Sequence, residues 1–215
     1  MTNTLPVPPK EPTTIAELFS FYHEYVKVLY SAVQTENALP QEVLFELNAA
    51  FDHLSRRWTY GEEEAAVVRK CYGHLKRSCL DIFKISVREA RAQYDELRKI
   101  DTSAIDNGEF DKKLLALFAE IRSGATNARS MEGNGNTDPT GPIKAFDAWQ
   151  PVYANCLRLE ADFYHHHALD WAKRKWWIKY WKTTLLATTL SFLGATAGKV
   201  FGSEIFQWIK GFFAG

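Results

Sequence analysis

The stretch EEEAAVVRKCYGHLKRSCLDIFKISVREARAQYDELRKI, residues 62–100, decides the fold class. Its apolar residues recur in alternating steps of four and three, at Val68, Tyr72, Leu75, Cys79 and Ile82. This spacing is typical of an α-helix that packs lengthwise against other helices. We therefore predict one long helix from about Glu62 to Ile100. The acidic triplet at its start suits the positive end of the helix dipole.

Two shorter helices are predicted before this long one. Thr14 and Glu17 form a capping box that opens the first helix, and Pro40 stands where a first-turn proline belongs in the second. We expect the first helix to face the core through Ile15, Leu18, Phe19, Tyr22, Val26, Leu29 and Val33. We expect the second helix to do so through Val43, Leu44, Leu47, Phe51, Leu54 and Trp58.

Two further helices are predicted after the long one. The turn residues Asp106-Asn107-Gly108 open a segment that ends in a Gly/Asn/Pro-rich loop, residues 130–142. A last helix begins near Ile143, and Pro151 is expected to kink it near its start. The fold class is therefore all-α, an up-and-down helical bundle over residues 14–170. A Pro-rich, disordered lead-in is expected at residues 1–13.

The composition limits the partners and the cellular compartment that we expect for the protein. The 26 basic and 26 acidic side chains cancel, so a nucleic-acid partner would need a local basic patch. The three cysteines are Cys71, Cys79 and Cys156, and the first two lie too far apart on one helix for a disulfide. We interpret them as small core residues of a cytosolic domain. We predict no cofactor and no metal: Asp162, His166 and Asp170 share a helix face, but we expect them to cap the end of the bundle.

From Trp171 the sequence changes character. Residues 171–182 interleave cations with aromatic rings, a mixture typical of a juxtamembrane segment at the lipid headgroup layer. Residues 183–201 follow as the predicted transmembrane helix, uncharged up to Lys199, and residues 202–215 as a short amphipathic tail helix in the interface. The alternatives are interfacial attachment and a soluble core helix. The predicted anchor residues are Trp176, Trp177, Trp181 and Lys182.

Because the basic flank precedes the span, the positive-inside rule places the protein in the cell inner membrane with the bundle on the cytoplasmic side. The lipid bilayer is then its first partner. Gly194, Gly198 and Gly202 recur every four residues, and such a ladder lets membrane helices approach closely. It predicts helix–helix association and a homo-oligomer. The alternative is that glycine is simply common in membrane helices.

The segment Arg69-Lys70-Cys71-Tyr72-Gly73-His74 fits R-x4-H. With the helical bundle around it, it resembles the HEPN superfamily, whose members often cut RNA at a dimer interface. The resemblance implies that Arg69 contacts phosphate and that His74 either serves acid–base chemistry or orients the attacking 2′-hydroxyl, both catalytic.

Three functions follow from these patterns. The first is a non-enzymatic membrane effector that oligomerises and perturbs or permeabilises the bilayer. In its plan it resembles small membrane-anchored helical proteins of bacterial antiviral defence. The second is a membrane-tethered HEPN-type ribonuclease, and the third a membrane scaffold for a cytosolic protein or RNA partner.

Overall fold

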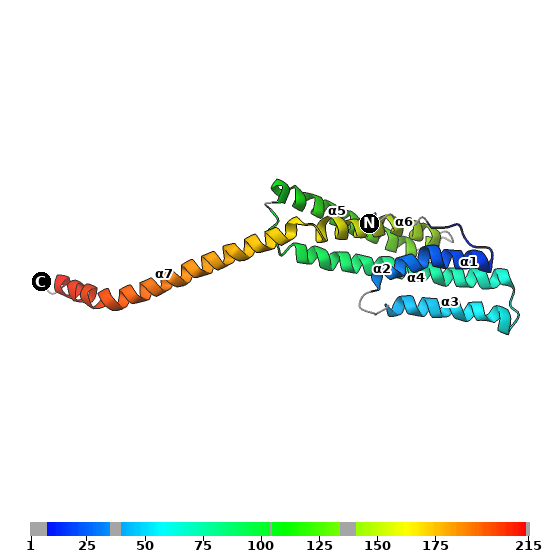
Figure 1. The fold of residues 1–215 in the computed structure, drawn as a ribbon, viewed down its shortest axis with the longest axis horizontal. Helices are drawn as coiled ribbons and strands as arrows, with labels where there is room; N and C mark the ends of the chain where they lie inside the picture. The colour runs from blue at the N-terminus through cyan, green and yellow to red at the C-terminus, as the bar shows by residue number, and fades with distance from the viewer. Residues whose placement is uncertain (1–7, 35–39, 104, 134–140, 214–215) are drawn as a thin grey trace.

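The computed structural model describes residues 8–34, 40–103, 105–133 and 141–213. Within these ranges it leaves out the side chains of residues 141–143, 176, 179, 192–201 and 203–213. All regular structure in the described ranges is helical, and the helices lie lengthwise in a bundle from which one long helix extends (Figure 1). The predicted all-α bundle is thus confirmed.

The helices follow the predicted order. The first is α1, Ile15–Phe21, which continues through a π-helical turn, η1, Tyr22–Val26, into α2, Lys27–Val33. Then come α3, Gln41–Thr59; α4, Glu64–Leu97; and α5, Glu109–Gly133, which follows a turn, η2, at Ile105–Gly108. The chain ends with α6, Gly141–Leu159; a second π-helical turn, η4, Glu160–Tyr164; and α7, Ala168–Phe213.

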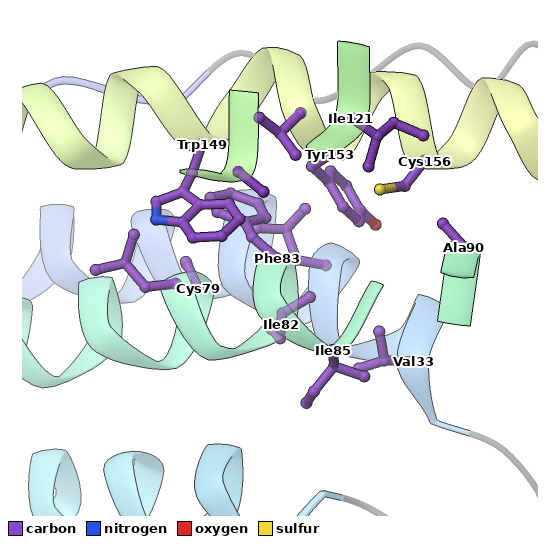
Figure 2. Packing of buried hydrophobic residues seen from close by; sticks show 14 of the residues in the cluster. Val33, Cys79, Ile82, Phe83, Ile85, Ala90, Ile121, Trp149, Tyr153 and Cys156 are labelled. Carbon is purple, nitrogen blue, oxygen red and sulfur yellow. The ribbon is translucent and has the colours of Figure 1, made fainter. Parts of the chain in front are cut away.

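The long helix α4 is the centre of the bundle, in contact with α1, α2, α3, α5 and α6. Figure 2 shows the core where Phe83 of α4 meets Trp149 and Tyr153 of α6. Trp149 is completely buried, and the guanidinium of Arg129 lies 5.7 Å from its ring centre. The three cysteines are buried and unpaired, as predicted. Burial raises the pKa of Cys71 to about 11 and that of Cys156 to about 12.

The first helix differs from its prediction at both ends. Thr14 is the N-cap and accepts a hydrogen bond from the Glu17 amide, but Glu17 accepts from the amide and hydroxyl of Thr13 and not from Thr14. These hydrogen bonds lower the pKa of Glu17. Further on, the π-helical turn changes the helical register. Phe21, just before this turn, and Tyr25 within it are buried, whereas Phe19 of the predicted core face is exposed.

Half of the predicted core stripe of the second helix is wrong: Val43 is buried and Leu47 and Leu54 pack partly buried against the core, as predicted, but the other three residues are exposed. In α3, Val43 and Ala50 are buried against the bundle, but Leu44, Phe51 and Trp58 are exposed. The reason is that α4 is the only helix with which α3 makes extensive contact in the described ranges. One neighbour covers one side of α3, and the apolar side chains beyond that side stay exposed. Figure 1 shows α3 along one edge of the bundle.

The C-terminal segment forms one helix of 46 residues, α7. It has no break at residue 182 or 201, where the juxtamembrane segment, the span and the tail were predicted to meet. Among the residues that were described in full, no helix offers a stretch both long and apolar enough to cross a membrane. The side chains of 192–201, in the second half of the predicted span, lie outside those residues.

The tight contact between Gly124 of α5 and Val152 of α6 leads to a stability prediction. A Cβ added at Gly124 of α5 would lie 2.7 Å from Cγ2 of Val152 in α6, and a β-branched valine has little freedom to move away. Gly124→Ala should therefore lower the free energy of unfolding by about 1–2 kcal/mol. In the matched control, Gly73→Ala in α4, the nearest atom is 4.0 Å away, and we expect a gain of about 0.5–1 kcal/mol. Denaturant unfolding followed by circular dichroism measures both, and equal stabilisation by the two would contradict this packing.

Candidate membrane-interface segment

Three histidines separate α7 from the bundle. His165 ends the π-helical turn η4, and Nδ1 of His166 accepts a hydrogen bond from the amide of Ala168, 3.2 Å away. The His166 ring also lies edge-on to Phe110 of α5. The ring thus caps the start of α7 while it is held against the bundle.

Only the first turn of α7 belongs to the core. Leu169 and Ala172 are buried, whereas all the fully described residues from Lys173 to Ser191 are exposed. Figure 1 shows the helix leaving the bundle and running away from it. At 1.5 Å per residue, a helix of 46 residues is roughly 69 Å long.

Cations and aromatic rings alternate along the exposed start of α7. Nζ of Lys175 lies 4.9 Å from the centre of the Trp171 ring, and the rings of Trp177 and Trp181 lie 5.5 Å apart. Trp177, Trp181 and Lys182, three of the predicted anchor residues, are all exposed. The side chain of Trp176, the fourth, lies outside the described residues.

Beyond the cations, the exposed apolar side chains lie on all sides of the helix. Successive residues are 100° apart, so Leu185, Leu186 and Leu190 together span about 140° of the circumference. Trp177 and Trp181 extend this sector to about 220°, and the exposed Tyr180 lies in the middle of the rest. A helix that is apolar all round needs an apolar environment all round, whereas a groove in a protein covers one side.

The threonines of this segment do not interrupt its apolar surface. Thr184 and Thr188 donate their hydroxyls to the carbonyls four residues earlier, at 2.9 and 2.7 Å. Thr189 donates to Leu185, and Thr183 to Tyr180 three residues back. Because each hydroxyl is satisfied within its own helix, none requires water or a second chain.

The predicted association residues are placed only in part. The side-chain surroundings of Gly194 and Gly198 lie outside the described residues. Gly202 is exposed, and a Cβ added there would meet no atom within 4 Å. Its face of α7 is therefore open to a neighbour.

The predicted catalytic pair occupies a different part of the protein. Arg69 and His74 lie on α4, and five residues on a regular helix place their side chains about 140° apart. Arg69 is exposed. His74 faces α3, with Nδ1 2.7 Å from Oε2 of Glu46, while Nε of Arg77 donates to the same oxygen. Within the described ranges, no hydrogen bond joins Arg69 to His74.

The partners of His74 were not foreseen from the sequence. Glu46 lies 28 residues earlier, and the ring of His53 stacks on that of His74 with centroids 5.1 Å apart. Burial, with the nearby His74 next, lowers the pKa of His53. Glu46 and His53 lie seven residues apart on one face of α3, and His74 lies on the facing helix α4. This helical spacing is the one signal in the sequence that could have grouped them. Together they form a polar clasp between α3 and α4.

No protein-family model, curated protein or solved structure gives a significant match to the chain. Its function must therefore be inferred from its own residues and their arrangement.

Because His74 belongs to the polar clasp, variants can distinguish a structural role of this residue from a catalytic one. We expect His74→Ala to lower the free energy of unfolding by about 1 kcal/mol, because it removes a hydrogen bond to a carboxylate. Arg69→Ala should leave stability unchanged. Denaturant unfolding and an RNA-cleavage assay on both variants make the comparison. RNA cleavage by the wild type that both substitutions abolish, with unfolding unchanged, would instead support the ribonuclease.

Proposed function

We propose that the protein is a membrane-anchored helical effector. Its bundle lies on the cytoplasmic side of the cell inner membrane, and α7 enters the bilayer. Association of several α7 helices then perturbs or permeabilises the membrane. The observation that carries this proposal is the exposed, all-round apolar surface of α7 beyond the bundle.

The order of side chains along α7 supports lipid as its environment. The first exposed turns bear Lys173, Arg174 and Lys175 among the tryptophans, and the leucines follow. Indole rings and long cationic side chains are favoured at the headgroup layer, and leucines in the hydrocarbon beyond it. The same order gives the direction, because cations before the span favour a cytoplasmic bundle.

The glycine ladder supports association within the bilayer. Hydroxyls already bonded in their own helix do not drive association, so the threonines provide no reason for oligomers. Gly194, Gly198 and Gly202 do, because a face without side chains lets a second backbone lie close. Gathering several such helices is a direct way for a short span to disturb a bilayer.

A scaffold for a cytosolic protein is the second candidate, favoured by the uncovered apolar side chains of α3. The ribonuclease stays a prediction to be tested with the Arg69 and His74 variants.

Membrane attachment is tested by charging the exposed leucines. An arginine in mid-membrane costs about 2.5–3.5 kcal/mol, so Leu186→Arg combined with Leu190→Arg should move the protein from the membrane pellet to the supernatant. Thr188→Val is the control and should stay in the pellet, because its hydroxyl is already bonded within the helix. Immunoblots of fractionated cells report both. Wild-type protein in the supernatant of lysed cells, without detergent, would end the proposal.

Association is tested at the middle of the glycine ladder. Gly198→Leu adds volume to this face without reducing hydrophobicity, so the variant should still insert but lose the contacts between α7 helices and any ion leakage. Leu190→Ile is the control and should change neither. Crosslinking in membranes and dye release from vesicles measure the two effects. If the wild-type protein stays monomeric in crosslinked membranes, membrane anchoring is the only role left for α7.

A further inference from the structure

The exposed apolar residues of α3 form a regular row. Leu44, Phe51 and Trp58 follow each other at seven-residue intervals, and Leu47 and Leu54 stand between them. The steps are three, four, three and four, the a and d positions of a coiled coil. Such a row normally lies against another helix. In α3 the a positions are the exposed ones, so the covering helix is missing from this chain's own described contacts.

The row borders a groove that a helix could enter. The groove has a volume of about 270 Å³ and lies between α1 and α3, above α4. Phe19 of α1 and Tyr22 of η1 form one wall, Phe51 of α3 forms the other, and Cys71 and Leu75 of α4 lie at its base. Its lining is almost wholly apolar.

The charges of α3 are directed away from this row. Asp52 pairs with Arg56 at 2.8 Å, Glu42 with Arg88 at 3.6 Å, and Glu46 with Arg77 at 3.0 Å. The polar residues beside the row on its open flank are Asn48 and Ser55, which are neutral. A residue near a two-fold axis faces its own copy, so a charge there would meet a like charge. The row carries none.

The exposed area suits a dimer of ordinary size. Phe19, Leu44, Phe51 and Trp58 are each between 44% and 69% exposed, which leaves roughly 500 Å² of apolar surface uncovered. A standard interface buries about 800 Å² per partner, of which about 60% is apolar, again about 500 Å².

We propose that a second copy of this chain covers the row, with the α3 helices of the two copies side by side and parallel. Leu44, Phe51 and Trp58 then each face their own copy across a two-fold axis, and each α3 fills the groove beside Phe19 of its partner. The contact goes beyond the association proposed for α7, because only bundle residues make it.

The parallel direction rests on the proposed membrane attachment. Figure 1 shows that α3 runs along the same long axis as α7. Two copies in one bilayer are related by an axis along the membrane normal, so their α3 helices point the same way. An antiparallel pair would send the two α7 helices in opposite directions.

Single cysteine substitutions in the full-length protein test the contact in native membranes. Under mild oxidation, Leu44→Cys, Phe51→Cys and Trp58→Cys should each give a disulfide-linked species of twice the 24.6 kDa chain mass. The three native thiols give little background, because they are buried and their pKa values are raised. Phe45→Cys is the matched control. Phe45 is as exposed as Phe51, 68% against 69%, but lies about 120° around α3, and it should not crosslink.

The possible results separate the partners. Absence of crosslinks at all three positions overturns the proposal, including the case in which the chain's own C-terminal helix or another protein covers the row. Crosslinks between mixed Leu44→Cys and Trp58→Cys copies, with none when either variant is present alone, indicate an antiparallel pair and overturn it as well. Crosslinks at all three positions in a protein that fractionates with the supernatant would support the contact while the membrane proposal fails.

A charge in the row provides a second measurement without disulfides. Phe51→Glu places two carboxylates at the two-fold axis. In the Gly198→Leu background, where α7 no longer associates, it should shift the mass in mild detergent, measured by light scattering, from dimer toward monomer. Phe45→Glu in the same background should keep the dimer mass. An unchanged mass in Phe51→Glu would contradict the contact. We expect the variant to stay folded, because an exposed position tolerates charge, and circular dichroism checks this.

Discussion

In the middle of α4, Phe83 lies against Trp149 and Tyr153 of α6, while on another face the thiol of Cys71 donates to the carbonyl of Ala50 in α3. Two sides of one helix are therefore covered by different neighbours, and the other helices are positioned by their contacts with it. Since α4 is 34 residues long, it can support α3 at one edge and the α5–α6 pair at another. The bundle depends on this double burial, and α3, with one main neighbour, is its least covered helix.

Much of this architecture follows from the sequence, because helices reveal themselves through apolar spacing. The break between α3 and α4 at Tyr60-Gly61 has turn-forming residues, and Gly61 has a φ of +67° that suits glycine. The loop expected at residues 130–142 is shorter than predicted, because α5 continues to Gly133 and α6 begins at Gly141. The sequence could not reveal which side of an apolar helix has a neighbour. The row of Leu44, Phe51 and Trp58 has core spacing but lies at the surface, since coverage depends on contacts between distant segments.

The candidate sites show the same contrast between local patterns, which the sequence reveals, and contacts between distant segments, which it does not. Cations, indoles and leucines in a short run of α7 are a local pattern, so its exposed, projecting character could be predicted from composition. The surroundings of His74 could not, because Glu46 and His53 come from another helix. A six-residue motif such as R-x4-H describes neighbours along one helix. It does not describe the partners across the helix interface, and these determine what a histidine does.

The two uncovered apolar surfaces of this protein require different partners, and their geometry says which. The row on α3 covers one side of one helix, has coiled-coil spacing and borders a groove, so a single helix is enough to cover it. The exposed leucines, tryptophans and Tyr180 of α7 lie on all sides, and one helix would leave some of them in water. Lipid covers a helix on every side at once, which a single protein neighbour cannot do. A copy of the chain against α3 and a bilayer around α7 are therefore compatible, and two copies side by side in one membrane provide both.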